Sequence, residues 1–157
     1  MPSRRELIQL THEEMAEFLD TSRTLIIVSN GVDGYPHPVP MWFCRDAEGR
    51  LCCTTFKKAQ KVLNFRRDPK ASLLVESGHD YEELKSVLIY AHADVVEDVD
   101  AVRDTLVGIN SKGRTVSEAE REELREAVSN TAEKRVMIRF TPQRYVSWDH
   151  AKLGGRY

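Results

Sequence analysis

Residues 51–65 read LCCTTFKKAQKVLNF, and their character changes halfway along. Compact and β-branched residues from Leu51 to Thr55 follow a turn at Glu48-Gly49, which predicts a strand. The second half spaces apolar side chains as a helix with one buried face would, at Ala59, Val62, Leu63 and Phe65. A strand that runs directly into a helix exposes unpaired backbone N–H groups and the positive end of the helix dipole.

The junction between these two halves carries hydroxyl groups and cations. Thr54 and Thr55 close the strand, and Lys57, Lys58 and Lys61 follow them. Hydroxyl donors and ammonium groups beside a helix N-terminus suit a phosphate group. A lysine-rich turn exposed to solvent has the same spacing, so both interpretations stay open from the residues alone. The glycines of a P-loop are missing, which excludes a nucleoside triphosphate site of that type.

The composition describes one ordinary globular domain. The chain has 157 residues, of which 41% are hydrophobic and 31% are charged, so we expect a single domain over residues 1–157. The net charge of −2 offers no field that would attract nucleic acid. Apolar runs are too short for a membrane span, and the N-terminus lacks the apolar segment of a secretion signal. We therefore expect a cytoplasmic protein without nucleic-acid or membrane partners.

The three cysteines, Cys44, Cys52 and Cys53, give an odd count without paired spacing. That pattern argues against a disulfide framework, and zinc would require a spaced pair of cysteines. Cys52 and Cys53 are neighbours on the expected strand, so they should point to opposite faces. We interpret all three as small buried residues in a reducing compartment.

Periodicity predicts a chain of strands with a few helices. Capping boxes at Thr11 and Ser117 should open two helices, and further helical stretches cover 59–65 and 100–109. Strands are expected at 23–29, 36–45, 51–55, 71–76, 86–97, 134–140 and 143–148, with Pro142 separating the last two. Seven strand candidates, mostly connected as hairpins, predict a mainly β protein: an antiparallel barrel with peripheral helices.

The second of these strands carries prolines at alternate positions, Pro36, Pro38 and Pro40. Proline has no backbone N–H, so it is tolerated only at sheet edges, strand starts and bulges. One side of this strand should therefore face something other than a neighbouring strand, and a planar ligand would fit there.

Four stretches together resemble a known family: DGYPHPVPMWF (33–43), TTFKKAQKVLNFRRDPKASLLVE (54–76), SVLIYAHADVVED (86–98) and KRVMIRFTPQRYVSWDH (134–150). They are similar to the pyridoxamine 5'-phosphate oxidase-like flavoproteins. The resemblance implies a split antiparallel β-barrel that binds FMN or the deazaflavin coenzyme F-420. It also implies a homodimer with the cofactor sites at the subunit interface, acting on a small-molecule substrate.

The resemblance also assigns roles to individual residues. It implies that Thr54, Thr55 and Lys61 hold the cofactor phosphate and that Lys57 is the basic residue of the adjacent loop. The backbone of one strand would lie against the isoalloxazine ring, and this strand comprises Pro38, Val39, Pro40, Met41 and Trp42. Asn64 matches a residue that is common in the family, and Trp148 matches a C-terminal aromatic that approaches the ring.

The chain departs from true pyridoxamine phosphate oxidases at three places. Ala59 stands near a position where those enzymes have an arginine, Phe43 follows the ring-binding strand where they have a lysine, and the C-terminus has no Arg-x-His. A substrate with its own phosphate needs such fixed cations. The expected function is therefore reduction of another small organic molecule with FMN, or with the deazaflavin as second choice. The alternative is a flavin-, deazaflavin- or haem-binding protein without turnover. No side chain is assigned as catalytic, because no Ser-His-Asp or metal-ligand pattern stands out.

Overall fold

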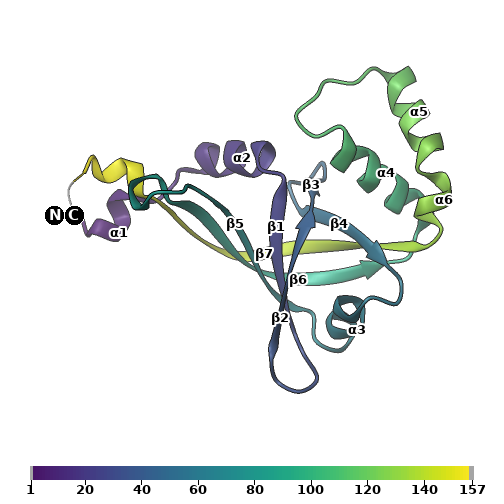
Figure 1. The fold of residues 1–157 in the computed structure, drawn as a ribbon, viewed down its shortest axis with the longest axis horizontal. Coiled ribbons are helices and arrows are strands. Elements are labelled where there is room, and N and C mark those ends of the chain that lie inside the picture. Colours follow the sequence, from purple (N-terminus) through teal and green to yellow (C-terminus); the bar gives the residue numbers. More distant parts are fainter. Residues whose placement is uncertain (1, 156–157) are drawn as a thin grey trace.

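The computed structural model describes residues 2–155, and seven antiparallel strands form one curled sheet at their centre, a split β-barrel (Figure 1). The strand order is β2-β1-β5-β6-β7-β4-β3. The strands are β1 (Thr24–Asn30), β2 (Pro36–Trp42), β3 (Cys44–Arg45), β4 (Leu51–Phe56), β5 (Lys70–Ser77), β6 (Lys85–Val96) and β7 (Arg135–Asp149). The mainly β architecture predicted from the sequence is confirmed.

The helices lie around the sheet, as Figure 1 shows. They are α1 (Arg4–Leu7), α2 (His12–Thr21), α3 (Gln60–Arg67), α4 (Val99–Asn110), α5 (Glu118–Ala127) and α6 (Ser129–Ala132), with short 3-10 turns at Tyr81–Glu83 and His150–Leu153. Helices α4 to α6 gather beside β4 and β7, whereas α1 and the C-terminal turn lie together at the other end of the sheet. Within residues 2–155, no helix is both long and apolar enough to span a membrane.

Two hydrophobic clusters hold these layers together. The larger fills the inside of the curled sheet and includes Leu25, Ile89 and Phe140, each fully buried. The smaller lies between α4 and the opposite face of β3, β4 and β7. Gly108 of α4 is required there, because a Cβ at this position would lie 2.9 Å from the Cys44 sulfur. A side chain would therefore push the helix away from the sheet.

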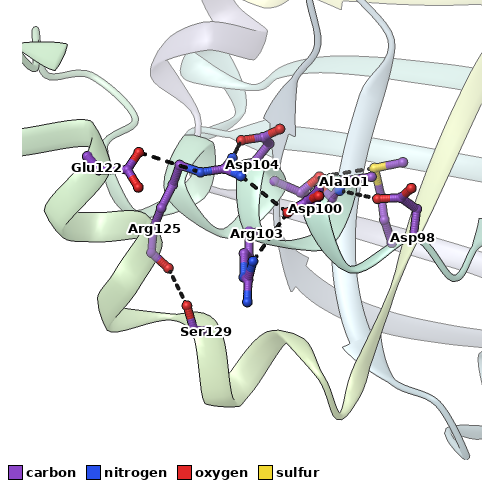
Figure 2. A network of polar contacts seen from close by, with 10 residues as sticks. Asp98, Asp100, Ala101, Arg103, Asp104, Glu122, Arg125 and Ser129 are labelled. Atoms are coloured by element: carbon purple, nitrogen blue, oxygen red, sulfur yellow. Dashed lines mark hydrogen bonds and ion pairs between the residues drawn. The ribbon is translucent and has the colours of Figure 1, made fainter.

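Arg125 joins α5 to α4 through several carboxylates (Figure 2). Its guanidinium contacts Asp104 and lies 3.3 Å from Asp100, while Glu122 on its own helix is 4.0 Å away. Its backbone carbonyl accepts a hydrogen bond from Ser129 at the start of α6. None of the α5 side chains is fully buried, and this charge network joins the helix to α4.

Both predicted capping boxes are present. The Thr11 hydroxyl accepts from the N–H of Glu14, and the Ser117 hydroxyl accepts from the N–H of Glu120. These bonds satisfy N–H groups that the first helical turn would otherwise leave unpaired. The starts of α2 and α5 are therefore local properties of the chain.

Three expectations were wrong in detail. The segment expected as one strand over 36–45 is divided at Phe43 into β2 and β3. The segments expected at 134–140 and 143–148 form one long strand, β7 (Arg135–Asp149), and not two strands separated by Pro142. Tyr90 pairs with Arg144 while Ala91 pairs with Pro142, so Gln143 is an extra residue in a bulge that accommodates the proline. Leu63 is 53% exposed, whereas Asn64 is fully buried beside Val62 and Phe65. The buried face of α3 is therefore rotated away from Leu63.

Candidate functional site

The candidate site is the split in the barrel, and one continuous stretch of chain creates this split. Residues 36–42 form β2, which pairs with β1 at one end of the sheet order, and residues 44–45 form β3, which pairs with β4 at the other end. Phe43 lies between the two strands and is fully buried. After Phe43, the pairing of β3 with β4 closes the barrel. Before Phe43, β2 does not pair with β4, and the split lies between these two strands.

The alternating prolines explain where pairing stops. Successive N–H groups of a strand point to opposite sides, and the N–H of Asp46 donates to the Arg50 carbonyl on the β4 side at 2.9 Å. Even-numbered N–H groups of this stretch therefore point toward β4. Pro36, Pro38 and Pro40 occupy three of these positions, so the edge of β2 facing β4 lacks donors there. Trp42 is the one residue of β2 that directs an N–H into the split.

Thr55 and Lys61 come together at the mouth of this split. The Lys61 ammonium donates to the Thr55 hydroxyl at 3.1 Å, and Thr55 is 4% exposed. Among the salt bridges of residues 2–155, none involves Lys57, Lys58 or Lys61. The predicted phosphate site therefore carries positive charge that no carboxylate of residues 2–155 neutralises.

Thr54 points to the other face of β4. It pairs in register with Met137, which belongs to the cluster under α4, whereas Thr55 pairs with Val136 of the inner core. On its own face Thr54 meets Arg135, whose guanidinium lies 3.4 Å from the Thr54 hydroxyl and 4.4 Å from the centre of the Phe56 ring. The two predicted hydroxyls therefore belong to two separate cation–hydroxyl pairs. Arg135 was missed because only strand register brings it beside β4.

Asn64 holds α3 against the sheet. It is fully buried, its amide donates to the Ser29 hydroxyl at 2.9 Å, and its oxygen accepts from Gln60 at 2.9 Å and Arg67 at 3.4 Å. With these bonds in place, the structure gives Asn64 a role in positioning α3, and through α3 the ammonium of Lys61.

A recess of about 280 Å³ adjoins the split where α3 meets the start of β2. It is lined by Gly31, Val32, Asp33, Tyr35, Pro36, His37, Gln60 and Asn64. His37 contributes a buried Nδ1 that has no hydrogen-bond partner within residues 2–155. Buried polar atoms are seldom left unpaired, so this nitrogen marks a place that a polar ligand atom or a water would satisfy.

The arginines after Lys61 are already engaged. Arg66 forms a salt bridge with Glu97 at 2.6 Å, and Arg67 donates to the Asn30 carbonyl. Lys57 and Lys58 are exposed in the loop between β4 and α3. Of the basic residues around α3, these two are therefore the ones left for a ligand that extends beyond a phosphate.

Trp148 lies far from these groups within one chain. It pairs with Ser86, whereas Thr54 and Thr55 pair with Met137 and Val136 near the other end of β7. Eleven or more residues of strand at about 3.3 Å each separate the two places, roughly 35 Å. A single chain does not bring Trp148 to the Thr55–Lys61 pair.

The cysteines are buried and unpaired. Burial raises the pKa of Cys44 to about 11 and that of Cys52 and Cys53 to about 12. The thiolate is the reactive form of cysteine, so these groups are poor nucleophiles at neutral pH. They act as packing residues in the two clusters, as the sequence predicted.

Comparison with known proteins gives one family match. A family model described as pyridoxamine 5'-phosphate oxidase matches residues 11–149. No curated protein matches the sequence significantly.

Solved structures share the fold over nearly the whole chain. A conserved hypothetical protein from Mycobacterium tuberculosis is 33% identical, with a TM-score of 0.86, over 99% of this chain and 95% of that one. An F420 reductase is 19% identical, with a TM-score of 0.59, over 92% of this chain and 98% of that one. The haem storage protein HutZ from Vibrio cholerae is 17% identical, with a TM-score of 0.60, over 89% and 97%. At these last two identities, the likeness establishes the fold alone.

Proposed function

Because this chain belongs to the pyridoxamine 5'-phosphate oxidase family, we propose that it binds a flavin-type cofactor in the split and uses it as an oxidoreductase. The observation that carries the proposal is the contact between the Lys61 ammonium and the Thr55 hydroxyl. Within residues 2–155, the one hydrogen-bond partner of this ammonium is a neutral hydroxyl, at a half-buried position at the mouth of the split. An ammonium held in this way is ready to bind a phosphate.

The edge of β2 suits the ring of such a cofactor. Pro36, Pro38 and Pro40 leave a flat edge without donors, and the Trp42 N–H offers one donor to a ring acceptor. When bound, the cofactor supplies the hydride chemistry at its ring, and the protein supplies position and electrostatics. We therefore assign Lys61 and Thr55 to the phosphate and the Pro38–Trp42 backbone to the ring.

The substrate is a small organic molecule other than pyridoxamine phosphate. Ala59, the N-cap residue of α3, is uncharged and makes no side-chain capping bond. The chain thus lacks the additional arginine that a second phosphate would need.

FMN is our first choice of cofactor and the deazaflavin is the second. The deazaflavin continues beyond its phosphate into a polyanionic tail, which would require further cations. The salt bridge of Arg66 with Glu97 removes one candidate, and Lys57 and Lys58 remain. The F420 reductase among the structures with this fold keeps the deazaflavin open.

The proposed active form is a homodimer. Val28, Leu88 and Val146 point outward from the sheet, are half-buried, and belong to neither hydrophobic cluster. A second copy packed on this face would cover them. It would also offer its own Trp148 to the cofactor site, which one chain alone does not bring there. The proposed location is the cytoplasm, in keeping with the free, buried thiols.

The decisive experiment titrates apo-protein with FMN and with the deazaflavin at two salt concentrations. FMN binding in the micromolar range or tighter supports the first choice. Deazaflavin affinity that falls more steeply with salt would indicate a tail held by exposed cations such as Lys57 and Lys58. Micromolar deazaflavin binding without measurable FMN binding would reverse the order of the two cofactors.

Turnover separates an enzyme from a carrier. The loaded protein should reduce at least one member of a panel of quinones, enones and tetrapyrroles. Stoichiometric cofactor binding with no reduction of any member would favour a carrier without activity, and tight haem binding in place of flavin would favour a haem-binding role. Sedimentation velocity with bound cofactor tests the dimer, and a monomer that binds cofactor normally would contradict it.

A further inference from the structure

We propose that His37 and Gln60 hold the hydroxyl-bearing chain that joins the ring of the cofactor to its phosphate. The site is the recess of about 280 Å³ between α3 and the start of β2, and its ligand is a neutral polyol chain. This inference rests on the proposed function, because the positions of the ring and the phosphate define which part of the cofactor lies at the recess.

The recess adjoins both ends of the assigned cofactor site. On α3, Gln60 lines the recess and precedes Lys61, whose ammonium contacts Thr55 of β4. On β2, His37 lines the recess and precedes Pro38, the first residue assigned to the ring. A ligand with its phosphate at Lys61 and its ring along β2 therefore brings its connecting chain past the recess. In FMN and in the deazaflavin, this connecting chain is a ribityl group.

The side chain of His37 points to the inner face of the curled sheet. Val39 and Met41, at alternate positions further along β2, pack against the inner core, and side chains of a strand alternate between its two faces. His37 pairs in register with Ser29, whose hydroxyl accepts from the Asn64 amide at 2.9 Å. The imidazole therefore lies on the side of β2 where α3 packs.

The imidazole of His37 presents a donor to the recess. Neither ring nitrogen has a hydrogen-bond partner within residues 2–155. Nδ1 is enclosed and the residue as a whole is half-buried, so Nε2 is the nitrogen that a ligand reaches. A buried N–H without an acceptor is rarer than an unpaired lone pair, which favours the proton of the neutral ring on Nε2. A ligand hydroxyl would accept this hydrogen bond.

The remaining polar groups of the recess suit a neutral ligand. Gln60 donates its amide N–H to Asn64 at 2.9 Å, and its Oε1 has no partner within residues 2–155, so this oxygen is available to accept from a hydroxyl. Among the described residues that line the recess, none is a lysine or an arginine, and Asp33 is the one carboxylate. A second anionic group would therefore be repelled there, whereas a polyol both donates and accepts.

The recess is shaped by contacts that involve no ligand. In the hairpin between β1 and β2, the Gly31 N–H donates to the Tyr35 carbonyl at 2.9 Å, and the Tyr35 N–H donates to Asp33 at 3.1 Å. A Cβ at Gly31 would lie 2.6 Å from the Tyr35 carbonyl oxygen, so this turn requires glycine. On the opposite wall, Asn64 is fixed by its bond to Ser29. The chain of the cofactor therefore enters a preformed site, which avoids the entropic cost of ordering the hairpin.

The test compares flavins that differ by one part at a time. Lumiflavin has the ring without the ribityl chain, riboflavin adds that chain, and FMN adds the phosphate. His37→Phe keeps a planar ring without nitrogens, and it should weaken the binding of riboflavin and FMN by about two- to tenfold while changing that of lumiflavin by less than about 1.5-fold. His37→Gln restores a donor near the position of Nε2 and should recover most of the affinity. His79→Phe removes an exposed histidine elsewhere and serves as the matched control.

The outcomes separate this inference from the proposed function. If His37→Phe weakens all three flavins equally or none of them, His37 does not hold the ribityl chain, although FMN binding and its dependence on Lys61 would still stand. If the wild type binds no flavin, the proposed function fails, and ribitol 5-phosphate still tests the recess. By isothermal titration it should bind the apo-protein more tightly than inorganic phosphate, and His37→Phe should remove this difference. Equal affinities for the two compounds in the wild type would refute the polyol site.

Discussion

Lys61→Gln tests the cofactor site most directly, because it removes the ammonium and keeps a polar side chain of similar length. The ammonium lies 3.1 Å from the Thr55 hydroxyl at a half-buried position. A charge-assisted hydrogen bond at such a site contributes about 1.5–3 kcal/mol, so binding should weaken by roughly ten- to a hundredfold. Solvent at the mouth of the split screens the charge, which favours the lower part of this range.

The two faces of β4 supply matched controls for this prediction. Thr55→Val should weaken binding, and combined with Lys61→Gln it should cost less than the sum of the single changes, since both remove parts of one contact. Thr54→Val and Arg135→Gln alter the equivalent cation–hydroxyl pair on the opposite face of the strand and should change affinity by less than about threefold. Arg121→Gln removes a distant charge and should have no effect.

Isothermal titration of each apo-protein with FMN and with the deazaflavin measures these differences. Thermal unfolding of the same apo-proteins shows whether a variant is folded, since the bond between Lys61 and Thr55 itself should contribute only about 0.5–1.5 kcal/mol to stability. The reasoning is refuted if the Thr54–Arg135 changes weaken binding while the Thr55–Lys61 changes do not. That result would move the phosphate to the other face of β4.

Three further predictions concern the rest of the fold. Burial lowers the pKa of Lys112 from 10.5 to about 8, so the charged amine destabilises the folded state below pH 8 and this effect is relieved as the pH rises toward 10.5. The free energy of unfolding, measured with denaturant, should therefore rise from pH 8 to pH 10 in the wild type relative to Lys112→Met, and a constant difference would contradict this. The three cysteines should not react with a thiol reagent at pH 8 until the protein is unfolded, because burial raises their pKa values; rapid reaction of a native thiol would show that the clusters open. Arg125→Leu should lower stability by about 1 kcal/mol through loss of the α4–α5 contacts and leave cofactor affinity unchanged; a loss of affinity would connect α5 to the site.

Much of this protein follows from interactions between residues close together in the chain. The capping boxes at Thr11 and Ser117 join residues three positions apart, so they identify helix starts without knowledge of the rest of the fold. The alternating prolines act in the same local way. Each removes one N–H from the same side of the strand, so Pro36, Pro38 and Pro40 predict an unpaired edge. The order of residues from Thr55 to Lys61 likewise suggested that a hydroxyl and an ammonium would meet where β4 gives way to α3, and the two groups lie 3.1 Å apart.

The partners of those residues depend on register and on packing between distant segments. Arg135 meets Thr54 only because β7 pairs with β4 across 81 positions of sequence. Asn64 is buried on α3 and Leu63 is exposed, and the Asn64 amide bonds to Ser29, 35 positions away in the sequence. His37 and Ser29 became neighbours through the pairing of β1 with β2. The sequence reveals helical and strand periods, helix caps and missing N–H groups, because each depends on residues close together in the chain. The contacts between distant residues form only when the sheet is complete.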